Sequence, residues 1–284
     1  MKTINSKDNK IYKICRELTA KKFRDKRGQY LIEGENLIEE ALKNQEILRI
    51  LLFREGFCAE SELRRWDMAC GVEKTVILEK RLFDCLAQTK TSQGIMAVVS
   101  KRVLEPDAFF TVLARRSSEN MVILDQLQDP GNIGTIIRTA DAAGYGGIIV
   151  IKGTSDLYAP KVVRAAAGSL FRVPVLFIND EKEVVRLVKS HGFKLVATCF
   201  DTKDYYCDVD LSNRIALIIG NEGNGISRVL IESSDCRVKI PMSGNIDSLN
   251  AAVAAGILMY ESVRGKWLAP LPLKNNDIDQ NNFL

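Results

Sequence analysis

Three stretches decide the fold of this 284-residue chain: Asn132–Arg138 (NIGTIIR), Ile218–Ser227 (IIGNEGNGIS) and Ile240–Asn250 (IPMSGNIDSLN). Each places Gly, Asn or Ser at the end of an apolar, strand-like run and directly before a helical pattern. Open α/β folds bind ligands at that point, outside the carboxyl ends of the strands. The three stretches therefore predict an α/β fold with a ligand site in the second half of the chain.

Apolar runs alternate with helical patterns throughout this second half. The runs are nearly continuous in Val, Ile and Leu, which is typical of strands covered on both faces in a mainly parallel sheet. Strands are predicted at 121–127, 147–152, 172–177, 194–200, 214–220 and 237–242. Helices are predicted at 133–143, 159–168, 181–190, 227–233 and 249–264.

The first half repeats the alternation on a smaller scale, which predicts a second α/β block. Strands are expected at 29–32, 47–53, 75–78 and 94–100, and helices at 35–44, 61–70 and 81–87. Pro106 and the polar run 115–120 predict a linker between the blocks. The expected organisation is a basic N-terminal helix (1–27), a small domain (28–102), a linker (103–120), a larger domain (121–266) and a disordered tail (267–284).

The first 27 residues are strongly basic. Ten Lys or Arg residues against three acidic ones give this segment a charge of +7, although the whole chain carries only +4. Ile11, Ile14, Cys15 and Leu18 repeat at helical spacing, which predicts a packed amphipathic helix with a basic outer surface. Such a face is also typical of a merely solvated helix. Phosphate binding is the other interpretation, and it is favoured if the chain acts on a nucleic acid.

Composition excludes several classes of protein. No apolar run approaches the roughly 18 residues of a membrane span, and Met1–Asn9 lacks the apolar core of a signal peptide, so a cytoplasmic protein is expected. Seven scattered cysteines without a CxxC pair predict reduced thiols. The single histidine, His191, argues against a multi-histidine metal site and against a Ser-His-Asp triad. No metal is therefore expected.

In order and spacing, the three stretches resemble the signature motifs of the SpoU (TrmH-type) RNA ribose 2'-O-methyltransferases of the SPOUT superfamily. The block 28–102 is similar to the small RNA substrate-binding domain of many members, down to its opening Tyr30–Leu42 (YLIEGENLIEEAL). The resemblance implies a catalytic domain at 121–266 with a C-terminal trefoil knot, a known exception to the rule that chains do not thread loops. The knot would be built by about Thr198–Asn250. It also implies a homodimer whose site is completed near the subunit interface.

The resemblance further implies S-adenosyl-L-methionine as cofactor, bent among these loops with its adenine held largely by backbone groups. Matched position by position, Gly220, Ile240 and Leu249 correspond to cofactor contacts. Thr198 and Met242 are additional candidates.

Arg138 matches the catalytic arginine of the family. A ribose 2'-hydroxyl is a poor nucleophile, so it must be positioned and its proton or developing charge must be handled. Arg138 follows Asn132 by six residues, and on a helix starting near Ile133 it is expected to be reachable from the active-site end. A role as base is often proposed in the family, but a guanidinium stays protonated at ordinary pH. We favour phosphate clamping with stabilisation of the developing alkoxide, while the role as base stays open.

Four further polar residues complete the candidate catalytic site. Asn132 would orient Arg138 or the substrate through its amide, and Glu222 would fix the arginine or the loop. Ser248 and Asn250 match the polar pair of the third motif, whose hydroxyl and amide can bond to the cofactor loop or the ribose. An Asn or Ser before a helix is usually only an N-cap, but their joint occurrence favours a functional role.

The predicted function is S-adenosylmethionine-dependent methylation of a ribose 2'-hydroxyl in structured RNA, with ribosomal RNA favoured. Transfer RNA is the nearest alternative substrate. A non-catalytic RNA-binding ribosome-assembly factor and a knotted methyltransferase acting on a base nitrogen also stay open. The five intact polar residues argue against the binding factor, and the match of all three motifs favours the ribose enzyme.

Overall fold

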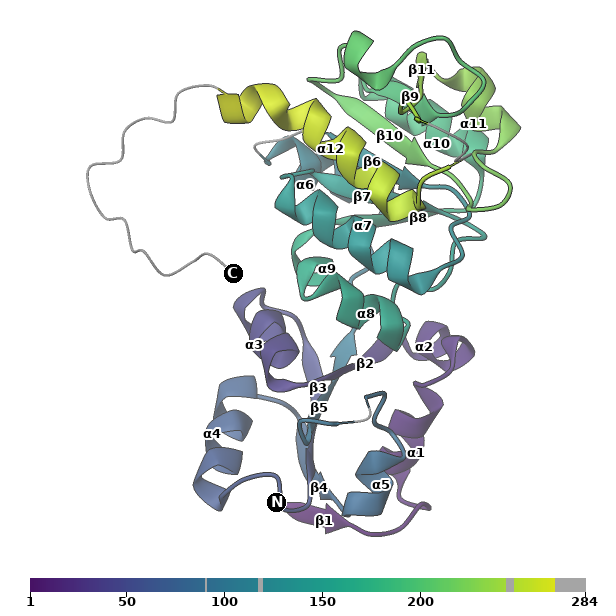
Figure 1. Ribbon diagram of the computed structural model, residues 1–284. Coiled ribbons are helices and arrows are strands. Elements are labelled where there is room, and N and C mark those ends of the chain that lie inside the picture. Colours follow the sequence, from purple (N-terminus) through teal and green to yellow (C-terminus); the bar gives the residue numbers. More distant parts are fainter. Residues whose placement is uncertain (90, 117–119, 244–247, 269–284) are drawn as a thin grey trace, which may run out of the picture.

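The computed structural model describes residues 1–89, 91–116, 120–243 and 248–268, which form two lobes built on separate β-sheets (Figure 1). The second half of the chain forms the upper lobe of Figure 1, and most of the first half forms the lower lobe. Among the described residues, no helix has the length and hydropathy needed for a membrane span. All seven cysteines carry free thiols, as expected from their spacing.

The upper lobe contains a six-stranded sheet with the strand order β11-β9-β10-β6-β7-β8. All its described pairings are parallel. The central strands are buried on both faces, as their continuous Val, Ile and Leu content predicts. The mainly parallel α/β fold is thus confirmed. The strands are β6 (Met121–Leu124), β7 (Gly147–Ile151), β8 (Val175–Ile178), β9 (Lys194–Thr198), β10 (Ile215–Ile219) and β11 (Cys236–Val238).

Helices cover both faces of this sheet. One apolar cluster joins Val122 and Ile148 to α7, α8 and α12, and the opposite cluster joins Met121 and Ile149 to α6, α10 and α11. In Figure 1, α7 and α12 run side by side across one face. The helices are α6 (Pro106–Ala114), α7 (Pro130–Ala142), α8 (Pro160–Ala166), α9 (Ser169–Arg172), α10 (Glu181–Ser190), α11 (Arg228–Ser233) and α12 (Ala251–Leu268).

The lower lobe contains a five-stranded mixed sheet with the order β1-β4-β3-β5-β2, in which β5 runs antiparallel to both neighbours. Helices α3 and α4 pack on one face, and α1 and α5 on the other. Its strands are β1 (Lys2–Ile4), β2 (Gln29–Glu33), β3 (Leu48–Arg54), β4 (Lys74–Leu78) and β5 (Ile95–Ser100). The helices of the first half are α1 (Lys10–Glu17), α2 (Lys21–Arg27), α3 (Glu35–Lys43), α4 (Glu60–Cys70) and α5 (Lys80–Asp84).

The first 27 residues do not form the single basic helix that was expected. They form β1, α1 and α2. Strand β1 pairs in parallel with β4 and buries Ile4. Helix α1 ends near Leu18, where Arg24 folds back and donates from one terminal nitrogen to the carbonyl oxygens of Leu18 and Thr19, each at 2.8 Å. A helix end leaves such carbonyls without partners, so Arg24 stabilises the break between α1 and α2.

The segment 103–120 also differs from the expected linker. Helix α6 lies within it and places Phe109, Phe110 and Leu113 in the core of the upper lobe. Pro106 occupies the first turn of this helix, where its missing N–H removes no helical hydrogen bond. The proline therefore marks a helix start rather than a break.

The end of α12 and the segment expected to form the knot lie next to residues that the structure does not describe. Helix α12 extends to Leu268, two residues into the tail predicted from 267, and residues 269–284 lie outside the described part. Residues 244–247, within the segment expected to build the knot, also lie outside it. The trefoil knot stays a prediction.

A buried ion pair joins the two lobes. Arg24 of α2 donates from Nε to Oδ2 of Asp156 at 2.7 Å, and the two side chains are only 5% and 8% exposed. Oδ1 of Asp156 accepts the N–H of Tyr158 at 2.9 Å, and the Tyr158 ring lies 4.8 Å from that of Tyr30 in β2. A buried charge whose partner is lost is strongly destabilising. This contact therefore fixes how the lobes meet.

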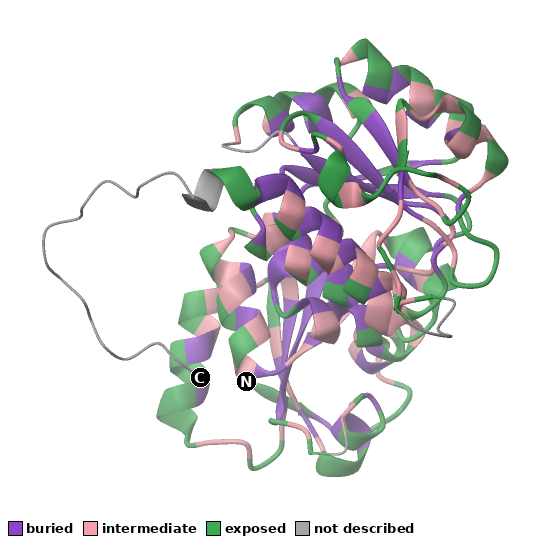
Figure 2. Ribbon diagram, turned by 45° about the horizontal axis from the view of Figure 1, so that its top comes forward, coloured by how far each residue is buried: buried purple, intermediate pink, exposed green. Residues whose placement is uncertain are grey.

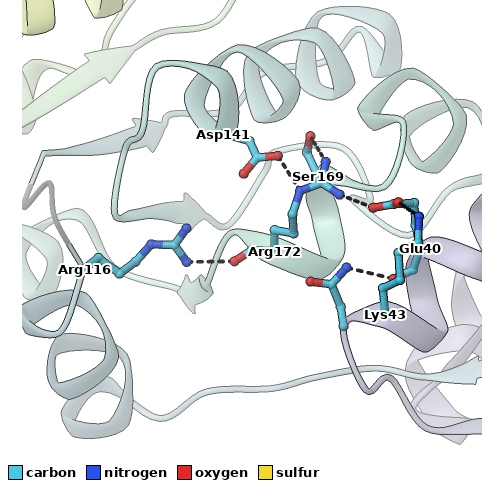
Figure 3. Close-up of polar contacts among 7 residues, drawn as sticks. Glu40, Lys43, Arg116, Asp141, Ser169 and Arg172 are labelled. Atoms are coloured by element: carbon cyan, nitrogen blue, oxygen red, sulfur yellow. Dashed lines mark hydrogen bonds and ion pairs between the residues drawn. The ribbon is translucent and has the colours of Figure 1, made fainter. Parts of the chain in front are cut away.

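A second contact between the lobes centres on Arg172, at the end of α9 (Figure 3). Its guanidinium pairs with Glu40 of α3 and, at 2.7 Å, with Asp141 of α7. It also donates to Oγ of Ser169 at 3.2 Å. Arg116 donates to the carbonyl oxygen of Arg172 at 2.8 Å. One side chain thus ties a helix of the lower lobe to a helix that carries the first motif.

We expect Arg172→Ala to lower the free energy of unfolding by about 1–2 kcal/mol, because hydrogen bonds to charged groups contribute at this level and the side chain is only 34% exposed. Urea denaturation of the full chain measures the change. Arg64→Ala is the matched control, since Arg64 pairs with Glu60 on the open surface of α4 with both side chains more than two-thirds exposed. Equal stability of the two variants would contradict the interlobe role of Arg172.

Candidate active site

A cavity of about 350 Å³ opens at the carboxyl ends of β9 and β10. Its walls come from the chain after β9, the loop after β10, the chain after β11 and the start of α12. Small-molecule sites have volumes of about 300–1,000 Å³, so the cavity has the size of a cofactor site. All five residues predicted to contact the cofactor line it: Thr198, Gly220, Ile240, Met242 and Leu249.

Gly220 lies at a point of close backbone approach in the cavity wall. A Cβ atom at this position would lie 2.4 Å from the carbonyl carbon of Gly225 and 2.5 Å from the backbone nitrogen of Ile226. Asn221 and Gly225 exchange two backbone hydrogen bonds of 2.9 Å across the same loop. The loop after β10 therefore closes tightly on itself, and only glycine fits at its start.

Side chains from the three predicted motifs meet beside the cavity. Asn132 donates from Nδ2 to Oε1 of Glu222 at 3.0 Å. Its Oδ1 accepts a hydrogen bond from Nδ2 of Asn250 at 2.9 Å. Glu222 and Asn250 line the cavity, whereas Asn132 does not and instead connects them. The Asn132 amide thus joins the second motif to the third.

Glu222 also holds the turn before α7. Its carboxylate accepts the N–H groups of Gln128 at 3.0 Å and Asp129 at 3.1 Å. Asp129 in turn caps α7, because its Oδ1 accepts the N–H of Asn132 at 2.9 Å. Burial raises the pKa of Glu222, but the hydrogen bonds outweigh burial and hold this pKa below its ordinary value. Of the two roles expected for Glu222, the structure places it at the loop and not at the arginine.

The polar pair of the third motif is divided between two positions. Asn250 caps α12, since its Oδ1 accepts the N–H groups of Ala252 at 2.9 Å and Val253 at 3.3 Å. The same residue contacts Asn132, so it serves both as a cap and as part of the site. Ser248 lines the cavity with an exposed side chain.

Arg138 does not reach this cluster within one chain. It lies on α7 with an exposed side chain, does not line the cavity and forms no ion pair with a described residue. Six residues on an α-helix correspond to a turn of about 240° and a rise of about 9 Å. Arg138 therefore faces away from Asn132, contrary to the position expected from the sequence, and Asn132 does not orient it.

The cavity walls fit S-adenosylmethionine. Ile219, Ile240 and Leu249 provide apolar surface for a flat ring, and Thr198 and Asn250 provide polar groups beside it. The bare backbone at Gly220 lets a ligand approach the main chain closely. Backbone contact with the adenine, as the resemblance implies, is compatible with this wall.

Two supporting residues were missed by the sequence interpretation. Asn221 donates from Nδ2 to the carbonyl oxygen of Gln126 at 2.8 Å, and its Oδ1 accepts two backbone N–H groups of its own loop at 2.9 Å. Asp125, 1% exposed, accepts the N–H of Ser227 at 2.6 Å, and burial raises its pKa. The sequence did contain signals: an Asn that can form an Asx turn, and an acidic residue at the end of a buried apolar strand.

Comparison with known proteins identifies the family. The sequence model of the SpoU rRNA Methylase family matches residues 119–260. The chain belongs to this family. A second model, the MRM3-like substrate binding domain, matches residues 9–97 of this SpoU protein.

Relatives of this SpoU protein match it over nearly their whole length. The 23S rRNA (guanosine(2553)-2'-O)-methyltransferase RlmP of Bacillus subtilis (strain 168) is 36% identical over 260 residues, which cover 92% of this chain and 98% of the relative. The AdoMet-bound rRNA methyltransferase of Sinorhizobium meliloti has a TM-score of 0.82 at 30% identity, with 93% and 98% of the two chains covered. The SpoU methyltransferase AviRb of Streptomyces viridochromogenes, solved with AdoMet, has a TM-score of 0.78 at 30% identity, with 91% and 99% covered. The similarity therefore includes both lobes.

Protonation of Glu222 would weaken the hydrogen bonds that hold this wall of the cavity. We therefore expect this SpoU protein to lose affinity for S-adenosylmethionine as the pH falls from 4.5 through the lower pKa of Glu222 in the folded protein. The pKa of Glu222 is lower in the folded than in the unfolded protein. The stability that the ionised carboxylate contributes to the fold is therefore fully present above pH 4.5 and is lost as the pH falls through the folded-state pKa. Calorimetric titration at several pH values measures the affinity. Glu222→Gln should bind roughly three- to tenfold more weakly near neutral pH and lack this acid loss. A native affinity unaffected by acid, while the fold persists, would contradict the role of the carboxylate.

Proposed function

We propose that this SpoU methyltransferase transfers a methyl group from S-adenosylmethionine to a ribose 2'-hydroxyl of ribosomal RNA. The observation that carries the proposal is the hydrogen-bonded chain from Glu222 through Asn132 to Asn250 beside a cavity of cofactor size. The named relatives support it, since RlmP is a 23S rRNA 2'-O-methyltransferase and two similar structures contain AdoMet.

The named residues position, support or stabilise the reacting groups in the proposed reaction. S-adenosylmethionine supplies an electrophilic methyl group, and the protein must align the hydroxyl with it. Asn132, Glu222 and Asn250 keep the wall of the cavity in one arrangement, because their polar groups are mutually bonded. Ser248 offers a hydroxyl to the cofactor or the ribose. The guanidinium of Arg138 binds an RNA phosphate and stabilises negative charge developing on the 2'-oxygen.

The proposed working unit is a homodimer. Helix α12 begins at the cavity and exposes Val253 and Tyr260, which are 51% and 48% exposed. Seven residues apart, they lie on one face of the helix. Figure 2 shows that the outward surface of the neighbouring α7 and α12 contains many intermediate and exposed residues. A second copy packed here in two-fold symmetry would bury the apolar face and bring its own Arg138 towards the first cavity.

The two lobes have separate roles in the proposal. Residues 28–102 form the RNA substrate-binding domain, which the match to the MRM3-like substrate binding domain supports. The basic segment 1–27 binds phosphates beside it. Residues 121–266 form the methyltransferase domain. The proposed location is the cytoplasm.

Methyl transfer to purified RNA tests the proposed function. The protein is incubated with methyl-labelled S-adenosylmethionine and ribosomal RNA from cells that lack it, and the RNA is then digested to nucleosides. We expect the label in a 2'-O-methyl nucleoside and none in a protein-free reaction. Label in a base would identify a nitrogen methyltransferase, and label only in transfer RNA would change the substrate. Cofactor binding without transfer to any RNA or ribosomal particle would contradict the enzymatic role.

A further inference from the structure

A second cavity, also about 350 Å³, lies between the two lobes and shares no lining residue with the cofactor cavity. Its walls combine α2 and the chain after β5 with the carboxyl ends of β7 and β8. We call it the interlobe groove. Its chemical character comes from Lys21, Lys101, Lys152, Tyr158, Phe177 and Asn179.

Phe177 gives the interlobe groove an accessible aromatic surface. It is the single exposed residue of β8, with 43% of its surface accessible, and β8 is an edge strand. Its ring centre lies 6.2 Å from that of Tyr158, and the two rings are inclined by 34°. Val103, 66% exposed, also lines the groove. Tyr158 is only 5% exposed and packs against the Phe177 ring, so Phe177 is the open ring of the pair. An open aromatic ring of this kind serves as a stacking surface for an unpaired base.

The charges around the interlobe groove favour an anionic ligand. Asp25 is paired with Lys101 at 2.6 Å, and Asp156 is paired with a buried arginine of α2 at 2.7 Å. Lys21 and Lys152 are exposed and form no ion pair with the residues that the structure describes. Both carboxylates of the groove are therefore neutralised, while two lysines keep an uncompensated positive charge beside the aromatic surface.

The wall of the interlobe groove is bonded to the active site. The side chain of Gln128 donates to the carbonyl oxygen of Gly153 at 2.7 Å, and Ser155 donates from Oγ to the carbonyl oxygen of Gln128 at 2.7 Å. The backbone N–H of Gln128 donates to Glu222. In the strand order, β7 and β8 are two and three positions from β10, which corresponds to about 10–15 Å along the sheet edge. A nucleotide close to the methylated one can span this distance.

We propose that the interlobe groove binds an unstacked nucleotide of the substrate RNA that flanks the target nucleotide. The base stacks on Phe177 beside Tyr158, Asn179 offers its amide to the base edge, and Lys21 and Lys152 bind the adjoining phosphates. This inference rests on the proposed RNA substrate. It adds a second point of attachment that positions the target ribose without touching the cofactor.

Phe177→Ala tests the stacking surface. Loss of one stacked base corresponds to about tenfold weaker RNA binding, so we expect the KM for ribosomal RNA to rise about tenfold. The Kd for S-adenosylmethionine should stay unchanged, because Phe177 does not line the cofactor cavity. Phe177→Trp should keep the KM for ribosomal RNA close to that of the native protein, since tryptophan also has a flat ring. Met68→Ala, at a position 84% exposed on α4, is the control and should behave as the native protein.

Lys152→Gln tests the phosphate contact by a readout that a structural role would not change. Removing one phosphate contact should reduce the slope of log binding constant against log salt by about 0.7–1. An unchanged slope together with an unchanged KM for Phe177→Ala would overturn the inference. The interlobe groove would then bind a protein segment or another ligand instead of RNA.

The two proposals can fail separately. If the native protein binds ribosomal RNA but transfers no methyl group, the proposed function fails, and direct filter binding still decides about the groove. In that case about tenfold weaker RNA binding by Phe177→Ala would support the inference, and equal binding would overturn it.

Discussion

Replacing Gly220 with alanine should strongly weaken binding of S-adenosylmethionine and so reduce methyl transfer when the cofactor is limiting. The new Cβ atom would lie 2.4 Å from a carbonyl carbon and 2.5 Å from a nitrogen of the loop main chain. Neither atom belongs to a flexible side chain, so the loop itself must move, and that loop is a wall of the cofactor cavity. Strain of this kind typically amounts to about 1–3 kcal/mol. We expect calorimetry to show an affinity about 100-fold below that of the native protein.

Gly223→Ala provides a matched control in the same loop. Its nearest neighbour would be Oδ1 of Asn221 at 3.6 Å, an ordinary contact distance. This variant should bind the cofactor within about twofold of the native protein. Circular dichroism during thermal unfolding shows whether either variant has lost the fold. If both variants bound equally well, close packing at Gly220 would not govern the cavity.

Replacing Arg138 with alanine should reduce methyl transfer by about 100- to 1,000-fold, the loss typical when a group that stabilises developing charge is removed. The affinity for S-adenosylmethionine should not change, because Arg138 does not line the cavity. The fold should also persist, because the side chain is exposed and unpaired among the described residues. Single-turnover rates at saturating RNA, with calorimetry for the cofactor, separate these effects. Arg138→Lys should recover only part of the rate, since lysine lacks the planar fork of arginine.

Mixing two variants that are each nearly inactive at limiting cofactor tests whether Arg138 serves the cavity of a second copy. In a dimer of one Arg138→Ala chain and one Gly220→Ala chain, shared sites would leave one site with both defects and one site intact. Random exchange of subunits should then restore about a quarter of the native activity. If each arginine served its own chain, no intact site would form and the mixture would stay inactive. That result would exclude the shared site.

Much of the fold could be predicted because local pattern and burial agree. Helix α10 was expected at 181–190 and is found at Glu181–Ser190. Its apolar residues repeat at helical spacing, and Asp180 caps its start by accepting the N–H of Lys182. The parallel sheet followed from continuous apolar strands for the same reason. In each case neighbouring residues alone contain the information.

The errors arose where distant residues decide a local structure. The break between α1 and α2 depends on Arg24, whose ion-pair partner Asp156 lies 132 residues later in the chain. No helical periodicity reveals such a pair. Pro106 was ambiguous in another way, because a proline both ends helices and occupies their first turn.

The sequence predicted which residues form the candidate site, but not which of them are hydrogen-bonded to one another. The motifs named Asn132, Glu222 and Asn250, yet their spacing could not show that the first amide bonds to both of the others. Arg138 belongs to the same motif as Asn132, but helix rotation places it on another face of α7. A motif names the residues of a site, whereas the three-dimensional fold determines which of them meet.

The buried pair of Arg24 and Asp156 has a consequence for substrate choice. Together with the apolar cluster that continues through both lobes, this pair holds the lobes in one arrangement. The distance between the basic N-terminal segment and the methyl-transfer cavity is therefore fixed. An RNA that contacts both places must present its target ribose at that distance from the phosphates bound by the N-terminal segment. The fixed distance would therefore select RNAs whose folded shape matches it. Folded RNAs would then be distinguished by their shape, without any contact to a base. An unfolded strand of the same sequence would be a poorer substrate.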